Sequence, residues 1–177
     1  MASAVLLACS CTAVSASVDR AAAGERSVSA VERSALGGRI ATYERATWRW
    51  ERVMGASRTE TAGRTLTAMS IRDVRQAVRL WRSRAEAAYR RAHRPPHLRA
   101  WLCIHRYEGS WTDTGAPYYG GLQMNLTFQE HYGWWLLRHK GTADHWTPLE
   151  QMWTAEKALR SRGFWPWPNT ARFCGLL

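Results

Sequence analysis

Two segments in the N-terminal half carry hydrophobic residues at intervals of three or four, the spacing of one helix face. The first stripe consists of Ile40, Tyr43, Thr47, Trp50 and Met54, and Gly55 ends it. The second stripe consists of Ile71, Val74, Val78, Trp81, Ala85, Ala88 and Ala92. Ser70 is suited to cap the second helix, and Asp73 follows in the first turn, where the helix dipole favours an acid. The pattern predicts one amphipathic helix along each stripe.

The segments beside these stripes have no such period. Residues 18–39 are rich in Ala, Ser, Gly and Arg, and we expect them to be flexible. Residues 56–70 are polar and rich in Thr, and no element is predicted there.

The sequence changes character at Pro95-Pro96, which ends the second helix and is well placed to begin another. A helix over 97–108 puts Trp101, Ile104 and Glu108 on one stripe. The following residues alternate turn formers with aromatics, which predicts a loop or a small hairpin. We therefore set a domain boundary near Arg94.

Two more helices are predicted in the C-terminal half. Thr127 is the expected cap of the first, which ends with basic residues before Gly141. Thr147-Pro148-Leu149-Glu150 is a capping signature for the second, which ends at Gly163. We expect Glu156 on its inward face to be structural, and the aromatic tail after Gly163 to pack back on the domain. The predicted fold class is α+β, mainly α.

The positive charge lies in the N-terminal half. The chain has a net charge of +11, and residues 1–100 hold 18 arginines and 8 acidic residues, against 7 basic and 6 acidic residues in the remainder. The arginines Arg72, Arg75, Arg79, Arg82, Arg84, Arg90 and Arg91 fill the outer faces of the second helix. The two helices either pack as a hairpin against the next domain or lie on a polyanion. We favour packing with a charged outer face.

The first 17 residues resemble an export leader. Residues 4–16 are small and apolar and end in Val14-Ser15-Ala16, which suits signal cleavage, but no positive n-region precedes them and the apolar core is short. Leu6-Leu7-Ala8-Cys9 resembles a lipobox, so Cys9 is a candidate for lipid anchoring. We expect a truncated leader, a secreted or cell-envelope protein, and no transmembrane helix, because no apolar stretch approaches ~20 residues. Cys103 and Cys174 then form a disulfide; in a cytosolic protein they would be reduced core thiols.

Glu108 is the candidate acid. It continues an apolar helix face, where the charged form of a carboxyl loses solvation. A carboxyl that keeps its proton near neutral pH is the donor that glycosidic cleavage needs. The alternative is a buried structural Glu paired with Arg or a backbone amide.

The loop after Glu108 supplies candidate sugar contacts. Trp111, Tyr118 and Tyr119 are suited to stack on sugar faces, and Thr114 and Gln123 to hydrogen-bond hydroxyl and acetamido groups. Gly120 and Gly121 allow the backbone to approach a ligand closely.

The order of these motifs resembles the resuscitation-promoting factor, or transglycosylase-like, family of actinobacteria over about residues 98–177. The residues that carry the resemblance are Glu108-Gly109-Ser110-Trp111, Thr114-Gly115, Tyr118-Tyr119-Gly120-Gly121-Leu122-Gln123, Ala155-Glu156 and Trp165-Pro166-Trp167-Pro168-Asn169. The resemblance implies a lysozyme-like fold, action on peptidoglycan, Glu108 as the single essential acid, and Thr114, Tyr119 and Gln123 in the glycan cleft.

Two departures from the family pattern matter. The family's cysteine beside the catalytic Glu and its cysteine in the terminal Trp-Pro motif are replaced by Tyr107 and Thr170. Cys103 and Cys174 lie four residues away in opposite directions, which suggests a disulfide retained at a new place and supports export. The loop between Glu108 and Thr114 is also shorter, which alters the cleft.

We therefore expect Glu108 to protonate the bond between N-acetylmuramic acid and N-acetylglucosamine, with no cofactor and no metal. Asp113 is the nearest second carboxylate, to stabilise the cation or position water, although a solvated loop Asp is the simpler interpretation. Without a secure second carboxylate, lytic transglycosylation is favoured over hydrolysis.

Two rival hypotheses remain. One is a non-catalytic protein that binds wall glycan and is anchored to acidic wall polymers by its arginine-rich half. The other is a nucleic-acid binder, which the balanced charge of residues 101–177 disfavours for that domain but not for residues 40–94.

Overall fold

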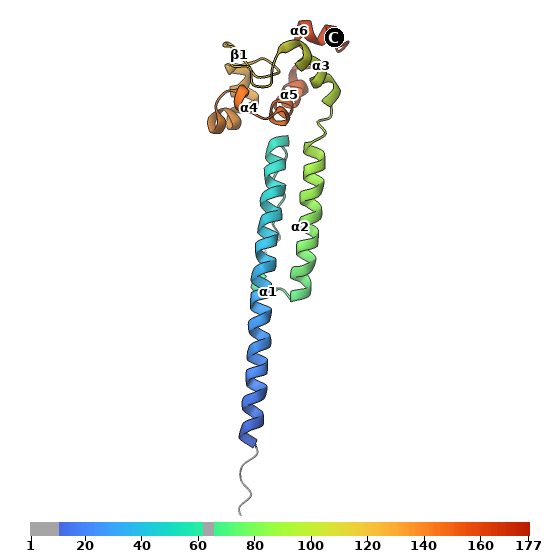
Figure 1. The fold of residues 1–177 in the computed structure, drawn as a ribbon. Coiled ribbons are helices and arrows are strands. Elements are labelled where there is room, and N and C mark those ends of the chain that lie inside the picture. The colour runs from blue at the N-terminus through green and yellow to red at the C-terminus, as the bar shows by residue number, and fades with distance from the viewer. Residues whose placement is uncertain (1–10, 62–65) are drawn as a thin grey trace, which may run out of the picture. The chain divides into compact units, whose positions relative to one another are not determined.

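The computed structural model of this chain describes residues 11–61 and 66–177, with side chains described from Ser29 onward. The elements are α1 (Cys11–Met54), η1 (Leu66–Ala68), α2 (Ile71–Ala92), α3 (Leu98–Glu108), β1 (Tyr118–Tyr119), β2 (Met124–Asn125), α4 (Leu126–Lys140), η2 (Ala143–His145), α5 (Pro148–Arg162) and α6 (Pro168–Phe173) (Figure 1). The α+β, mainly α class is confirmed. The residues divide into two units, 1–43 with 62–82 and 44–61 with 83–177, and each is described by itself.

Helix α1 corrects the prediction for residues 18–39. They are helical, because α1 runs without interruption from Cys11 to Met54. Alanine and arginine favour helix, and the segment contains no proline. Leu36 and Ile40 are buried, so tertiary packing supplies what the irregular apolar pattern does not. The leader prediction lies mostly outside the described residues, since Cys9 and its neighbours precede Cys11.

Polar contacts hold the first unit together at the start of α2. The Arg33 guanidinium donates to the carbonyls of Leu66 (3.0 Å) and Met69 (2.5 Å). Nε of Arg75 donates to Oε1 of Glu32 at 3.0 Å. Ser70 caps α2 as predicted, because its Oγ accepts from the Asp73 amide at 3.2 Å. These bonds attach residues 66–75, at the start of α2, to α1.

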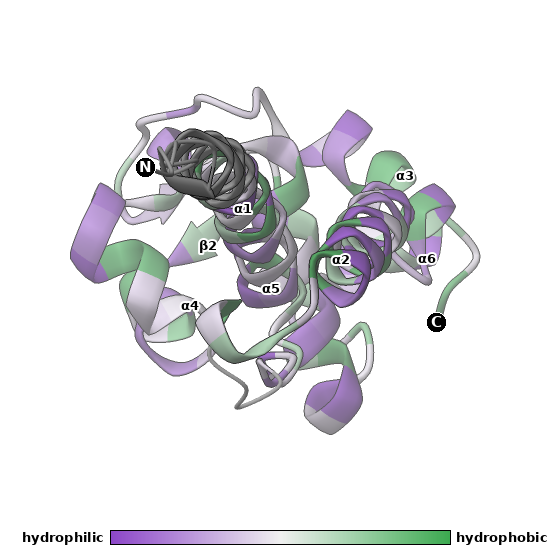
Figure 2. Ribbon diagram, turned by 90° about the horizontal axis from the view of Figure 1, so that it is seen from below, coloured by the Kyte–Doolittle hydropathy of each residue, from purple (hydrophilic) through white to green (hydrophobic). Residues whose placement is uncertain are grey.

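The apolar stripes of α1 and α2 are used for packing. In the second unit Trp50 contacts the rings of Tyr89 and His93, with centroids 5.5 and 4.8 Å apart. Met54 and Ala92 form a cluster with Trp153 of α5, whose Nε1 donates to the Ala92 carbonyl at 2.8 Å. Figure 2 shows that α2 carries both hydrophilic (purple) and hydrophobic (green) positions. The apolar positions of these helices are therefore buried or partly buried, and the predicted outer arginines of α2 are exposed except for Arg84, which is partly buried. Binding of this charged face to a polyanion stays a prediction.

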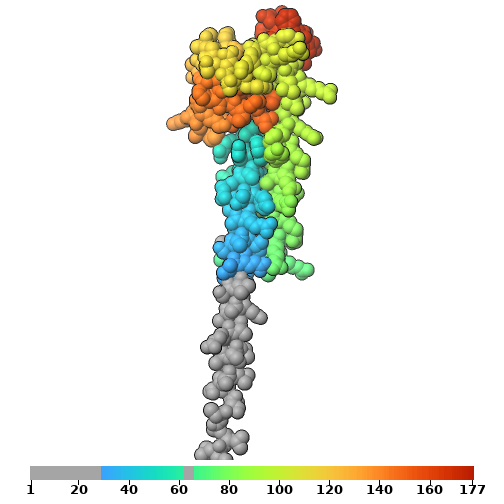
Figure 3. All heavy atoms as spheres, viewed as in Figure 1, coloured from blue at the N-terminus to red at the C-terminus, as the bar shows by residue number. Residues whose placement is uncertain are grey.

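The main core gathers the helices from α3 to α6. Trp101 and Ile104 of α3 are fully buried, as the stripe predicts. Glu156 of α5 is structural, as expected: Oε1 accepts from the His97 amide and from Nε1 of Trp101, both at 2.8 Å. Figure 3 shows the side chains of this region, yellow to red, packed closely against one another.

The caps of the C-terminal helices follow the sequence with one exception. Asn125, not Thr127, caps α4, since its Oδ1 accepts from the Phe128 amide at 2.8 Å. The α4 helix begins earlier because β2 ends directly at its first turn. Thr147 and Glu150 form the predicted capping box of α5. β1 and β2 pair antiparallel, with Tyr118 opposite Asn125, as the predicted small hairpin.

The predicted disulfide is confirmed. Cys103 and Cys174 are bonded, with their Cα atoms 6.0 Å apart, and the bond links α3 to the end of α6. Among the described residues, no helix combines the length and the apolar character that crossing a bilayer requires.

Candidate functional site

Glu108 is the last residue of α3 and is half-buried. Its Oε1 accepts a 2.7 Å hydrogen bond from the hydroxyl of Thr170, a buried residue of α6. Within the part of the chain that the structure describes, the recorded partner of this carboxylate is therefore a hydroxyl, not an Arg or a backbone amide. A single neutral donor leaves acceptor positions of a carboxylate open for a further partner.

The chain turns at Gly109, directly after Glu108, and two predicted site residues lie beside this glycine. Gly109 has φ of 154°, a conformation that side chains rarely adopt. A Cβ at Gly109 would lie 3.1 Å from Oδ2 of Asp113 and 3.5 Å from Nε2 of Gln123. The structure thus gathers Glu108, Asp113 and Gln123 around one glycine.

Asp113 organises this loop with its own hydrogen bonds. Oδ1 accepts from the Gly115 amide at 3.0 Å, and Oδ2 accepts from Nε2 of Gln123 at 2.9 Å. Its backbone carbonyl accepts from the Gly120 amide at 2.8 Å. Both carboxylate oxygens are engaged, so Asp113 fixes the orientation of Gln123.

A groove of about 410 Å³ runs beside the hairpin. Tyr118 and Gln123, two of the predicted sugar contacts, line it together with residues of α4 and with Trp167. Trp167 is anchored by its Nε1, which donates to the Leu122 carbonyl at 2.7 Å. Glu108 is not among the lining residues, although its partner Thr170 lies three residues beyond Trp167.

The other predicted sugar contacts lie elsewhere. Trp111 is half-buried and stacked on His105, with ring centroids 3.9 Å apart and planes inclined by 22°. Thr114 is exposed, and Tyr119 is partly buried against the main core. Their roles in glycan binding stay predictions.

The two glycines of the hairpin serve the protein's own packing. A Cβ at Gly120 would lie 2.6 Å from Oε1 of Gln151, and one at Gly121 would lie 2.5 Å from Nδ1 of His105. The close approach expected toward a ligand is therefore made to Gln151 and to His105.

No protein family, curated protein or solved structure matches this chain. The candidate site therefore depends on its own geometry and on the order of its motifs. Within the described residues, no three His, Cys, Asp or Glu side chains are grouped so that they could hold a metal ion.

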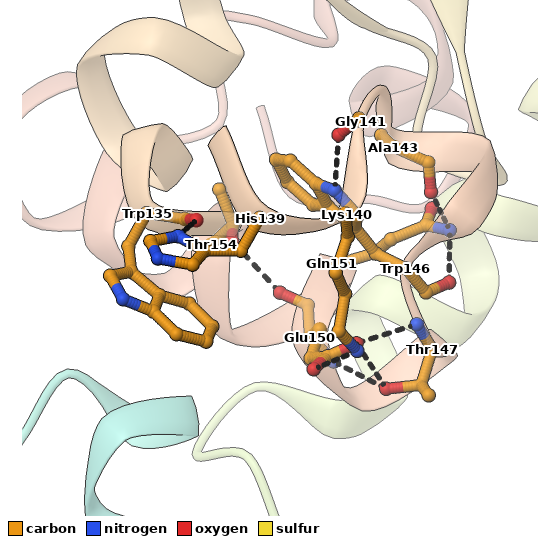
Figure 4. A network of polar contacts seen from close by, with 10 residues as sticks. All are labelled: Trp135, His139, Lys140, Gly141, Ala143, Trp146, Thr147, Glu150, Gln151 and Thr154. Carbon is orange, nitrogen blue, oxygen red and sulfur yellow. Dashed lines mark hydrogen bonds and ion pairs between the residues drawn. The ribbon is translucent and has the colours of Figure 1, made fainter. Parts of the chain in front are cut away.

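Sequence reasoning missed Gln151, which connects the loop after Glu108 with η2. It is fully buried, and its Nε2 donates to the Trp111 carbonyl at 2.8 Å. The same nitrogen donates to the carbonyls of Ala143 at 2.8 Å and of Trp146 at 3.2 Å (Figure 4). The sequence signal for a buried Gln151 is its place directly after the capping box, beside positions of the same helix that face inward. The sequence pattern marks Thr170 only as the residue that stands in place of a cysteine, and it gives no signal for His105.

Proposed function

We propose that residues 95–177 form a lysozyme-like domain that cleaves the β-1,4 glycosidic bond of bacterial peptidoglycan, with Glu108 as general acid. The observation that carries the proposal is the placement of Glu108 at the end of α3, with its carboxylate held by Thr170 and with Asp113 and Gln123 gathered around the next residue. The motif order shared with the resuscitation-promoting factor family supports the same assignment.

In the proposed reaction Glu108 transfers its proton to the glycosidic oxygen, and an oxocarbenium-like sugar forms. Attack by water completes hydrolysis, whereas attack by the muramoyl 6-hydroxyl leaves an anhydro end. Both Asp113 oxygens are already bonded within the loop, which makes Asp113 a positioning residue for Gln123 and a poor base for water. This supports the transglycosylase route.

The groove supplies the proposed glycan contacts. Tyr118 is 48% exposed, so its ring is available to stack on a sugar. Nε2 of Gln123 donates to Asp113 and to the Gly120 carbonyl, and its amide oxygen, which has no hydrogen-bond donor among the described residues, is available to a sugar hydroxyl. The disulfide supports an exported, cell-envelope protein, because such bonds persist in oxidising compartments. Lipid anchoring at Cys9 belongs to the same proposal.

The test is digestion of purified peptidoglycan, with the products identified by mass spectrometry. We expect anhydro-muropeptides from the wild type and none from Glu108→Gln. The matched control is Glu130→Gln, which changes an exposed glutamate of α4 and should retain activity. Full activity in Glu108→Gln would reject the role of Glu108, and products without anhydro ends would show hydrolysis.

A second candidate is a protein that binds wall glycan without cleaving it. The absence of Glu108 from the groove lining favours it. This candidate predicts that wild type and Glu108→Gln bind insoluble peptidoglycan equally and that neither releases soluble fragments. Acidic wall polymers remain proposed partners of the arginine-rich half, and no specific nucleic acid is expected.

A further inference from the structure

A second cavity, of about 370 Å³, lies between the C-terminal part of α1 and the helices α4 and α5, within the unit of residues 44–61 and 83–177. Four of its lining side chains are cations, namely Arg49, Arg52, Lys140 and Lys157. Glu150 is its one carboxylate. The volume falls within the range of small-molecule sites, roughly 300–1,000 Å³.

The charge of Glu150 is already balanced. Nζ of Lys140 donates to both carboxylate oxygens, at 2.7 and 2.8 Å. Oε2 also accepts from the amide of Thr147 at 2.8 Å and from its hydroxyl at 3.0 Å, as Figure 4 shows. Glu150 is 7% exposed and is committed to the start of α5, so it does not neutralise the other three cations.

Those three cations have no carboxylate partner among the described residues. The Arg52 guanidinium lies 4.6 Å from the centre of the Trp135 ring, and that of Arg49 lies 5.1 Å from the centre of Trp50. Nζ of Lys157 has only a long bond, 3.3 Å, to the Tyr132 carbonyl. A guanidinium that stacks on an aromatic ring keeps its N–H edge available for an oxyanion.

Burial makes the unsatisfied charge of Lys157 costly. Desolvation lowers the pKa of Lys157, and the nearby positive charge of Arg160 lowers it further. An anion in the cavity would reverse both effects by pairing with the ammonium group. The cavity is therefore complementary to a ligand with more than one negative charge.

An aromatic surface accompanies these cations. Trp134 lines the cavity and is 57% exposed. Trp135 beside it is occupied by Arg52 and by the stacked ring of His139, 4.3 Å away. Trp134 thus offers an indole face to a sugar ring at the mouth of a cationic site.

We propose that this cavity binds a sugar that carries a phosphate monoester, with the phosphate between Arg49, Arg52 and Lys157 and the sugar against Trp134. A phosphate monoester carries about −1.5 to −2 charges near pH 7 and three acceptor oxygens, which matches three unneutralised cations. A carboxylate carries one charge and two oxygens, and a phosphodiester carries one charge, so both match less well.

This inference does not depend on the proposed cleavage of peptidoglycan, because it uses none of Glu108, Asp113 or Gln123. A variant that loses phosphosugar binding but still cleaves peptidoglycan, or one that loses cleavage but still binds the phosphosugar, distinguishes the two proposals. Tyr132 lines both this cavity and the groove beside the hairpin, so a ligand here would lie next to the proposed glycan path.

The test is isothermal titration of the full-length protein with glucose 6-phosphate at fixed ionic strength. We expect binding to the wild type and a loss of about tenfold or more in affinity for Arg49→Gln/Arg52→Gln, since two charge-assisted hydrogen-bond donors are removed. The matched control is Arg90→Gln/Arg91→Gln, which removes the same charge from exposed positions of α2 outside this cavity. Equal weakening by both double variants would overturn the site, because the effect would then be general electrostatics.

Ligand comparisons test the chemistry. Glucose should not bind, and glucuronate should bind at least about tenfold more weakly than glucose 6-phosphate. Trp134→Ala should weaken the binding of glucose 6-phosphate and leave the affinity for inorganic phosphate unchanged. Because this variant keeps all four cations, it tests the site even if an arginine variant fails to fold. Equal affinity of the wild type for glucuronate, or no effect of Trp134→Ala, would overturn the assignment to a phosphorylated sugar.

The phosphosugar has two sources, a free metabolite or the terminal group of a wall polymer. Co-sedimentation with bacterial cell walls, before and after phosphatase treatment that removes monoesters, distinguishes them. If the wild type is retained on cell walls, if phosphatase treatment abolishes this retention, and if Arg49→Gln/Arg52→Gln is not retained, the ligand is the terminal group of a wall polymer. Binding of free glucose 6-phosphate without such retention assigns the metabolite. Absence of both would overturn the proposal.

Discussion

Thr170 donates a 2.7 Å hydrogen bond to the carboxylate of Glu108 from a position 62 residues later in the chain. The disulfide between Cys103 and Cys174 joins the same two parts of the fold, α3 and the end of α6. A hydrogen bond at Glu108 and a disulfide at Cys103 therefore both link α3 to the C-terminal helix.

Thr170→Val should reduce cleavage of peptidoglycan through kcat, with KM unchanged, because Thr170 contacts Glu108 and is not among the residues that line the groove beside the hairpin. Thr170→Ser should restore activity, since it restores the hydroxyl. Both are measured by steady-state release of muropeptides. Thr154→Val is the control: its hydroxyl bonds the Glu150 carbonyl at 2.8 Å in a fully buried position. Both valine variants should lose about 1 kcal/mol of stability, and only Thr170→Val should lose activity. Equal cleavage activities of Thr170→Val and Thr154→Val would contradict the role of Thr170 in positioning Glu108.

Removal of the disulfide should destabilise the fold without abolishing its core. Cys103→Ala/Cys174→Ala opens a link across 71 residues, for which we expect a loss of about 2–5 kcal/mol in the free energy of unfolding. Urea unfolding measures this loss. A reducing agent should destabilise the wild type by a similar amount and leave the double variant unchanged. If the reducing agent also destabilised the double variant, the loss of stability would not come from this disulfide.

Lys157 should make stability depend on pH. Burial lowers its pKa below the ordinary value of 10.5, so the unfolded chain binds more protons in the interval between the two values. Stability should therefore rise as the pH increases through the lowered pKa toward 10.5. Lys157→Met should be more stable than the wild type at neutral pH, with the difference narrowing as the pH rises. Chemical unfolding across this range measures the difference, and a constant difference would exclude Lys157 as the cause.

Gly120→Ala should destabilise the hairpin. Gly120 has φ of +71°, which costs an L-residue roughly 1–2 kcal/mol, and the new Cβ would collide with Oε1 of Gln151 at 2.6 Å. Gly38→Ala is the matched control, because nothing lies within 4 Å of its Cβ position in α1. It should stabilise the protein by up to about 1 kcal/mol. Thermal unfolding of both variants tests the pair, and similar shifts in Tm would contradict this account.

Local patterns in the sequence were sufficient for much of the fold. The spacing of apolar residues located α2 and α3, and Thr147 with Glu150 located the start of α5. These features depend on residues within one or two turns of each other, so they are readable without tertiary structure. The flexible interpretation of residues 18–39 was wrong: they are helical, and Leu36 and Ile40 are buried, which requires tertiary packing that an irregular apolar pattern does not reveal.

In the candidate site, too, some features were readable from the sequence and others were not. The sequence by itself identified Glu108, the loop that follows it and the pair Cys103 and Cys174, because these depend on residue type, order and spacing. Only the tertiary structure decided that Thr170 reaches Glu108, that Gln151 anchors the loop and that Arg52 faces Trp135. Each of these contacts joins segments at least 40 residues apart. The packing of helices, not any local pattern, determines which of these side chains meet.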